Sequence, residues 1–290
     1  MAEDIPVEAC PDCGRADSRD LYRDSKYSFR ECAGCLSIYC SPRTVLEFDD
    51  AYSEGYYRAS YLPREQETIS YYGREIMPLV RKHLQPGGRI LDIGCGTGFF
   101  LKAAMDSGYR VVGVEPSAFA SEYCRSHWGM ECHSGFFEDL SLGGFDLIVL
   151  MNVFTQLTTD KKILLGKIRE SLNPGGKILI KTICWNRAYP IVCGMLPNEA
   201  LQRLCLHIPL QHYIYHDRNI GPCLEGSGFT VSAIEKCAGE WSLLRGMAFG
   251  RIRLSAAIAI KWLLLKSLCG PVKTDMLVVA AKDRTAPESG

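Results

Sequence analysis

One segment constrains the fold of this chain more than any other: in residues 90–101 a strand, a glycine loop and a helix follow one another. Apolar residues over 90–93 predict a buried strand, and the apolar run that starts at Phe99 begins a helix. Between them Gly94, Gly96 and Gly98 occupy every second position. Glycine permits positive φ and lets a ligand approach the backbone without a Cβ in the way. The segment therefore predicts a ligand-binding turn at the carboxyl end of a strand.

Apolar strands alternate with helical segments along most of the chain. The expected strands are 89–93, 110–115, 130–133, 145–151, 177–183, 229–234 and 276–281, and the expected helices are 65–84, 99–107, 117–128, 159–172 and 217–227. This rhythm predicts an α/β, Rossmann-like, doubly wound sheet of seven strands with helices on both faces. Two segments break this alternation, at about 185–216 and 237–272. Long insertions at the carboxyl ends of the strands of such a sheet often build substrate sites.

The N-terminal 45 residues carry a cysteine pattern typical of a metal site. Cys10 and Cys13 form one pair and Cys32 and Cys35 another, with 18 residues between the pairs. This spacing fits a two-knuckle zinc site, in which four thiolates close a tetrahedral, structural Zn²⁺ site. An iron centre or four reduced cysteines are the alternatives. The start of the chain lacks a secretory signal pattern, which favours a reducing cytosol and argues against disulfides.

The glycine loop is close to the NAD fingerprint but lacks its third glycine, because Phe99 stands there. Gly-x-Gly-x-Gly preceded by Asp92 resembles motif I of the class I methyltransferases. The resemblance spans about residues 89–281 and implies a sheet whose last strand is antiparallel. It implies that residues 94–98, with Gly94, Cys95, Gly96 and Gly98, wrap S-adenosylmethionine, and that Asp92 orders the cofactor's amino group.

Other motifs of the same family follow at matching intervals. Glu115, before Pro116, resembles the acid that accepts the ribose hydroxyls. Phe137 and Glu138 match the adenine-contacting motif, although Phe136 replaces its customary acid. The segments 145–152 and 172–177 match the fourth strand and the turn before the fifth. The resemblance implies three parts of the chain: a zinc ribbon over 1–45, an aromatic linker over 46–64, and a methyltransferase domain over 65–283.

The order of ribbon, Pro-Arg step and Tyr56-Tyr57 pair resembles methyltransferases related to the ubiquinone-pathway O-methyltransferases and to sugar methyltransferases. This resemblance implies a small-molecule, sugar or lipid-linked glycan acceptor. Relatives often carry Glu-His where Thr155 and Gln156 stand. His212 is therefore our candidate for the acceptor-side base or positioning group, since histidine is the commonest base. Asn152 is expected to line the reaction centre and the cofactor site, and Tyr57 to fold over the cofactor. Packing roles for His212 and the tyrosines are the alternatives.

Charge patterning bears on partners and location. Formal net charge is zero, with 33 basic and 33 acidic residues, which disfavours nucleic acid as a partner. Residues 245–273 form a basic, apolar stretch without an acid. Such a helix can lie in a membrane interface, or it can cap the active site or form a dimer surface. We therefore expect a cytoplasmic protein with a peripheral contact to the inner face of the membrane as one option, and the sequence leaves the oligomeric state open.

Two competing functions remain open from the sequence. A ribosomal RNA base methyltransferase can also begin with a zinc ribbon, but residues 1–45 carry eight acids against six bases, whereas an RNA-binding ribbon is expected to be basic. A catalytically silent cofactor-binding scaffold is compatible with the altered Thr155-Gln156 pair, and the intact loop and Glu115 argue against it. The acceptor atom, whether oxygen, nitrogen or carbon, is not specified by the sequence.

Overall fold

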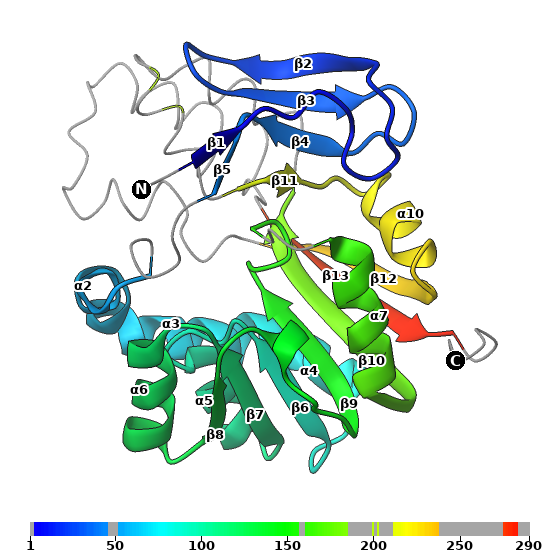
Figure 1. The fold of residues 1–290 in the computed structure, drawn as a ribbon. Helices are drawn as coiled ribbons and strands as arrows, with labels where there is room; N and C mark the ends of the chain where they lie inside the picture. The colour runs from blue at the N-terminus through cyan, green and yellow to red at the C-terminus, as the bar shows by residue number, and fades with distance from the viewer. Residues whose placement is uncertain are drawn as a thin grey trace, which may run out of the picture.

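The computed structural model describes residues 3–45, 52–156, 160–184, 199, 202, 211–237 and 275–283. These residues form a seven-stranded sheet flanked by helices, a four-stranded sheet and a two-stranded sheet. Figure 1 shows the small N-terminal sheet packed against the carboxyl-terminal edge of the large one.

The large sheet carries the glycine loop. Its strands are β6 (Arg89–Ile93), β7 (Arg110–Glu115), β8 (Glu131–Ser134), β9 (Phe145–Met151), β10 (Leu172–Ile183), β12 (Phe229–Cys237) and β13 (Asp275–Lys282). Their order in space is β12-β13-β10-β9-β6-β7-β8, and β13 runs antiparallel to both of its neighbours. The predicted Rossmann-like sheet with an antiparallel last strand is confirmed. Because β6 lies between β7 and β9, the chain reverses its winding at β6, which is where such folds bind ligands.

Helices cover both faces of this sheet. They are α3 (Glu65–Tyr71), α4 (Met77–His83), α5 (Phe99–Asp106), α6 (Ala118–Trp128), α7 (Lys161–Ser171) and α10 (Ile220–Glu225), and a π-helical turn over Tyr72–Ile76 joins α3 to α4. Alternate residues of each strand enter two separate cores. Leu91 and Ile148 pack on the side of α7, whereas Ile90 and Leu147 pack on the side of α4 and α5. This two-sided burial explains why the strands read as continuous apolar runs.

The N-terminal residues form their own sheet. Its strands are β2 (Ser18–Arg23), β3 (Ser28–Cys32), β4 (Ile38–Ser41) and β11 (Tyr213–Ile214), and β1 (Glu3–Ile5) pairs separately with β5 (Arg43–Val45). Strand β11 comes from the second half of the chain and pairs antiparallel with β4, so that Tyr213 lies opposite Tyr39. Strand β4 would otherwise lie at the edge of the N-terminal sheet, and β11, from a segment that follows β10, pairs with its free side.

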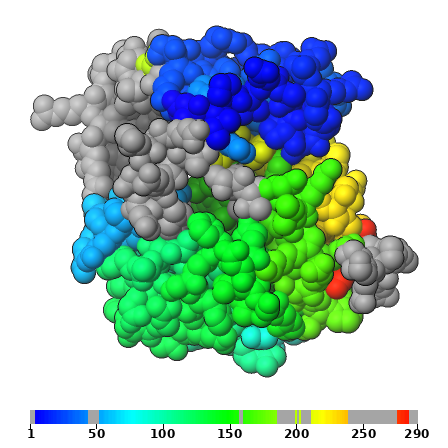
Figure 2. All heavy atoms as spheres, in the orientation of Figure 1, coloured from blue at the N-terminus to red at the C-terminus, as the bar shows by residue number. Residues whose placement is uncertain are grey.

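Buried polar contacts join the N-terminal sheet to the α/β part. Asp12 forms an ion pair with Lys161 at the start of α7, and both side chains are largely buried. Lys161 Nζ also donates to Tyr215 Oη at 2.8 Å. Asn219 donates to the Leu36 carbonyl at 2.8 Å. Figure 2 shows the blue N-terminal residues lying directly against green and yellow parts of the chain.

Several boundaries differ from expectation. The turn expected at 173–176 lies within β10, as a shift of register between Leu172 and Lys177. The helix expected over 217–227 is the shorter α10. Within the expected aromatic linker, α2 (Glu54–Tyr56) leads into helical turns over Tyr57–Tyr61 and Leu62–Arg64.

The insertions fall mostly outside the described residues, which include only 199, 202 and 211–216 of the segment 185–216 and only residue 237 of 237–272. The basic stretch 245–273 lies wholly outside them. Among the described helices, none has the length and hydropathy needed to cross a bilayer.

We predict that Asp12→Ala destabilises the fold by about 3 kcal/mol, because it leaves the Lys161 ammonium buried without its counter-ion. Urea denaturation would measure the loss of unfolding free energy. The matched control is Arg23→Ala, which removes the exposed pair with Asp20 and is expected to cost under about 1 kcal/mol. Equal losses in both variants would contradict a buried link between the N-terminal sheet and α7.

Candidate functional site

The glycine loop between β6 and α5 has the backbone shape that a ligand-binding turn requires. Gly94, Gly96 and Gly98 have φ values of 71°, 54° and 81°. A Cβ at Gly94 would lie 2.6 Å from Val153 Cγ2, so the loop approaches the end of β9 closely. The left-handed Gly98 is the N-cap of α5. A side chain is disfavoured by conformation at all three glycines, and at Gly94 and Gly98 by lack of space as well.

Asp92 is an acid near the carboxyl end of an inner strand of the sheet. It lies on β6, and only 1% of its surface is exposed. Its Oδ1 has no hydrogen-bond partner among the described residues. Burial, together with the nearby Glu115 carboxylate, raises the pKa of Asp92 well above its usual range. A buried carboxyl oxygen without a partner is costly, and a cationic or hydrogen-donating ligand group would remove that cost.

Glu115 ends the neighbouring strand β7 and points at the same loop. Its carboxylate accepts hydrogen bonds from the Gly96 N–H at 2.8 Å and the Ser117 N–H at 2.9 Å. Burial raises the pKa of Glu115 to about 7, although these two hydrogen bonds act in the opposite direction. Since β6 and β7 are parallel neighbours, Asp92 and Glu115 form a pair of buried acids at one edge of the sheet.

Tyr57 covers this acid pair from the helical turns that precede α3. Its hydroxyl lies 3.5 Å from Glu115 Oε1, and its ring lies 3.7 Å from the position of a Cβ on Gly96. The side chain is 3% exposed. Tyr56 and Tyr61 pack against its ring in edge-on contacts. The aromatic segment therefore contributes Tyr57 to the surroundings of the loop.

Asn152 follows β9 in a backbone conformation that favours glycine, with φ of 63°. Its N–H donates to the Lys181 carbonyl at 2.9 Å, and its Oδ1 accepts from Lys181 Nζ at 3.1 Å. Lys181 is fully buried and forms an ion pair with Asp275 at 2.5 Å. The sequence analysis missed Lys181 and Asp275, because they lie 94 positions apart on β10 and β13. A strained residue held by a buried ion pair at a strand end is typical of a functional site.

His212 immediately precedes β11 and contacts the segment that follows β9. Its N–H donates to the Thr155 carbonyl at 2.8 Å, and its carbonyl accepts from the Cys40 N–H at 2.9 Å. Thr155 Oγ1 and Gln211 Oε1 are buried and have no hydrogen-bond partner among the described residues. The structure therefore brings His212 next to the Thr155-Gln156 positions, in polar surroundings and between the N-terminal sheet and the glycine-loop region.

A bridge of hydrogen bonds connects this second region to the first. Tyr52 Oη donates to Gln156 Oε1 at 2.5 Å, and the Tyr52 carbonyl accepts from Ser117 Oγ at 3.1 Å. Ser117 is also the residue whose N–H binds Glu115. His212, Asn152 and the acid pair thus border one region at the carboxyl ends of β6, β7 and β9.

The remaining expected cofactor residues are less directly placed. Pro116 follows Glu115 and is half-buried. Phe137 is fully buried in the core on the α7 side, under the Lys167 ammonium, which lies 5.6 Å from its ring centroid. Glu138 accepts a hydrogen bond from Lys167 through its main-chain carbonyl. Neither Phe137 nor Glu138 has a described contact with the glycine loop.

The four N-terminal cysteines converge as their spacing predicts. The sulfurs of Cys10, Cys13, Cys32 and Cys35 all lie within 4.8 Å of one another. The two loops are alike: the Gly14 N–H donates to the Cys10 carbonyl and the Leu36 N–H to the Cys32 carbonyl, and both Gly14 and Leu36 have positive φ. Four converging thiols on paired turns fit a tetrahedral metal ion.

Comparison with known proteins identifies a family. A family model described as "Methyltransferase domain" matches residues 64–234, which is more than half of the chain. The chain is 31% identical over 137 residues to ribosomal protein L11 methyltransferase of Thermus thermophilus, covering 45% of this chain and 52% of that protein. It is 33% identical over 133 residues to a ubiquinone biosynthesis O-methyltransferase of Chelativorans sp., covering 43% and 50% respectively. The chain thus spans about half the length of these curated relatives.

A solved structure supports the fold. Geranyl diphosphate C-methyltransferase from Streptomyces coelicolor, in complex with S-adenosyl-L-homocysteine, is similar with a TM-score of 0.52 and 17% sequence identity. The match covers 77% of this chain and 82% of that one. At this identity the likeness is one of fold.

We predict that Asp92→Asn stabilises the ligand-free protein at pH 8 by roughly 1–2 kcal/mol, because it removes a buried charge with an unpaired oxygen. Since the pKa of folded Asp92 is raised, the wild type loses stability as pH rises above the unfolded value near 4. The difference in unfolding free energy between Asp92→Asn and the wild type should therefore become smaller as pH falls toward 4. Urea denaturation at several pH values measures it.

Asp146→Asn is the opposite control. The Asp146 carboxylate accepts from the Arg89 N–H at 2.8 Å and from Asn173 Nδ2 at 2.7 Å. Burial opposes its ionisation, but these hydrogen bonds prevail and lower its pKa. Asp146→Asn should therefore destabilise the protein above pH 4. An Asp92→Asn protein that is less stable than the wild type at pH 8 would contradict the assignment of an unsatisfied acid.

Proposed function

The chain belongs to the methyltransferase domain family, and we propose that it transfers a methyl group from S-adenosylmethionine to a small-molecule, sugar or lipid-linked glycan acceptor. The observation that carries the proposal is the pair of buried acids, Asp92 and Glu115, beside the Gly94–Gly98 loop. The unpaired Asp92 Oδ1 suits the cofactor's amino group, and the Glu115 carboxylate suits its ribose hydroxyls. Gly94, Gly96 and Gly98 carry no Cβ, which lets a ligand approach the backbone of the loop closely.

The chain's own residues supply alignment. S-adenosylmethionine, when bound, carries a methyl group already activated on a sulfonium sulfur, so that positioning contributes much of the rate, up to ~7–11 kcal/mol. Asp92 would hold the amino group of the cofactor's methionine part and Glu115 its ribose hydroxyls, and Cys95 would contribute main-chain contacts within the loop. Tyr57 closes over the acid pair and excludes water. Asn152, whose side chain accepts a hydrogen bond from Lys181, would line the reaction centre.

His212 is our candidate for the acceptor side. Its segment is hydrogen-bonded to Thr155, and Thr155 Oγ1 and Gln211 Oε1 are buried polar atoms without described partners. Such atoms favour an acceptor that carries hydroxyl or amino groups, because an apolar acceptor would leave them unsatisfied. His212 would accept the acceptor's proton if the reaction requires its removal, and would orient the acceptor if it does not.

The test of function is transfer of label. Purified protein is incubated with methyl-labelled S-adenosylmethionine and with fractionated lysate of the source cell, with Asp92→Ala as the inactive control. We expect Asp92-dependent label in the glycan, lipid or small-metabolite fraction. Label confined to RNA would favour the ribosomal RNA alternative, and no Asp92-dependent label in any fraction would favour a silent scaffold.

Cofactor affinity should depend on pH through Glu115. Because the pKa of Glu115 is raised to about 7, the carboxylate that accepts the ribose hydroxyls is scarce at pH 6 and prevalent at pH 8. The association constant for S-adenosylhomocysteine, measured by calorimetry, should rise by up to ~10-fold per pH unit below 7 and level off above it.

Two variants make this test specific. Glu115→Gln should bind S-adenosylhomocysteine more weakly and should lose most of the increase in association constant with pH. Glu122→Gln, which alters an exposed acid paired with Arg125 on α6, should keep the wild-type profile. A Glu115→Gln protein with an unchanged pH profile would show that another group controls cofactor binding.

We also propose that the N-terminal cysteines hold a structural Zn²⁺ ion. Four thiolate ligands leave no open position for water or substrate. Cys13→Ser should lose one equivalent of zinc relative to the wild type by elemental analysis, and it should be less stable because metal binding is coupled to folding of such small sheets. Cys40→Ser, which alters a buried cysteine outside the cluster, should retain the zinc. Zinc content equal in both variants would exclude this assignment.

A further inference from the structure

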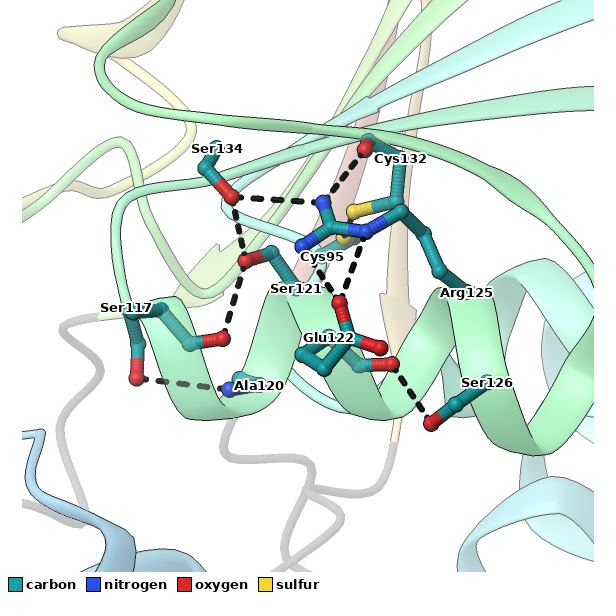
Figure 3. A network of polar contacts seen from close by, with 10 residues as sticks. Cys95, Ser117, Ala120, Ser121, Glu122, Arg125, Ser126, Cys132 and Ser134 are labelled. Carbon is teal, nitrogen blue, oxygen red and sulfur yellow. Dashed lines mark hydrogen bonds and ion pairs between the residues drawn. The ribbon is translucent and has the colours of Figure 1, made fainter.

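A second cluster of sulfur atoms lies directly beneath the glycine loop. Cys95 belongs to the loop, Cys124 to α6 and Cys132 to β8, and all three side chains are buried. Their sulfurs lie within 4.8 Å of one another. Cys95 Sγ is 3.7 Å from Cys132 Sγ and 4.0 Å from Cys124 Sγ. Figure 3 shows the Cys95 and Cys132 side chains approaching each other behind α6.

Two glycines leave the space that these sulfurs occupy. A Cβ on Gly113 of β7 would lie 2.7 Å from Cys95 Sγ and 3.2 Å from Cys132 Sγ. A Cβ on Gly98 would lie 2.7 Å from Cys124 Sγ. Any other residue at either position would displace a sulfur atom, so the backbone of two neighbouring elements is shaped around the cluster.

All three candidate ligands are thiols. Among the described residues, no imidazole or carboxylate belongs to the group that Cys95, Cys124 and Cys132 form. Met130 adds a thioether nearby. A Cβ on Gly98 would lie 3.7 Å from Met130 Sδ and 2.7 Å from Cys124 Sγ. Soft thiolate and thioether ligands select soft ions and not Mg²⁺ or Ca²⁺. Burial excludes the water that a harder ion would retain.

The spacing also fits a bound ion. Metal–sulfur bonds of ~2.3 Å in a trigonal or tetrahedral arrangement separate the sulfurs by ~3.8–4.0 Å. The observed separations of 3.7 and 4.0 Å match this range. In the N-terminal cluster the corresponding closest contacts are 3.5 Å. The closest sulfur–sulfur separations of both clusters are therefore compatible with coordination of one ion.

We propose that Cys95, Cys124 and Cys132 form a second metal site, which binds a soft, thiophilic d¹⁰ ion underneath the cofactor loop. Each thiol that becomes a ligand forms one sulfur–metal bond and releases its proton to solvent. Arg125, which donates to the Cys132 carbonyl at 2.8 Å, supplies positive charge beside the resulting thiolates (Figure 3). Because Cys95 stands between Gly94 and Gly96, an ion here restrains the loop itself.

The alternative is that the three cysteines serve only as small apolar core residues, as buried cysteines often do. The two readings differ in metal stoichiometry. The test uses the full chain, reduced and metal-free, titrated with ¹¹³Cd²⁺ under anaerobic conditions and followed by cadmium NMR. Cadmium is itself a soft d¹⁰ ion, and each thiolate site gives its own resonance.

We expect two resonances and two bound equivalents in the wild type. Cys13→Ser should lose only the N-terminal resonance, and Cys132→Ser only the inner one. Cys184→Ser, which alters a buried cysteine of β10 outside both clusters, should keep both. If Cys132→Ser folds poorly by circular dichroism, Cys124→Ala, which retains a small apolar side chain, must show the same loss of one equivalent.

A wild-type protein that binds a single equivalent, lost entirely in Cys13→Ser, would overturn the proposal. So would a second equivalent that survives both Cys132→Ser and Cys124→Ala. Thermal unfolding gives an independent readout. After the N-terminal site is filled, further Cd²⁺ should raise the melting temperature of the wild type and of Cys184→Ser. It should leave that of Cys124→Ala unchanged.

Discussion

The site depends on the burial of two carboxyl groups at the ends of adjacent parallel strands. Asp92 and Glu115 are almost fully buried, and burial raises the pKa of both. Glu115 is partly satisfied by the Gly96 and Ser117 N–H groups, whereas Asp92 Oδ1 is left without a described partner. A sheet that retains such an acid is less stable than one with an apolar residue there. The arrangement is explained by a ligand that brings the missing hydrogen-bond donors.

The N-terminal sheet contacts the segments that surround this site. It is completed by β11, and the residue before β11 is His212, whose main chain bonds to Thr155 on one side and to Cys40 on the other. The Asp12–Lys161 pair joins the turn that carries Cys10 and Cys13 to the start of α7. A metal ion held by the four N-terminal cysteines would therefore support the segment that presents His212, in addition to the small sheet itself.

Short-range patterns carried most of the successful predictions. The alternation of apolar strands and helices predicted the seven-stranded sheet, and the spacing of Cys10, Cys13, Cys32 and Cys35 predicted that their sulfurs converge. Asp92 and Glu115 were recognisable as candidates because Asp92 lies two residues before the first glycine of the loop and Glu115 ends the next expected strand. In all these cases, the residues that determine the local structure are close together in the chain.

Long-range pairings escaped the sequence analysis. The pairing of β11 with β4 joins residues that are far apart in the chain, and two residues in a strand give almost no periodic signal. Lys181 reads as a charge within an apolar strand, and its partner Asp275 is recognisable only once β13 lies beside β10. The positive φ of Asn152 occurs together with its hydrogen bonds to Lys181, and the sequence signals neither. Cys124 and Cys132 read as ordinary core residues until α6 and β8 bring them to Cys95.

The central claim is that the acid pair and the glycine loop are a cofactor site, and a crystal structure of the protein grown with S-adenosylhomocysteine tests it most directly. The account predicts the ligand's amino group within hydrogen-bond distance of Asp92, its ribose hydroxyls on Glu115, and Tyr57 packed over it. Ligand bound elsewhere, with Asp92 Oδ1 still unpaired, would contradict the account.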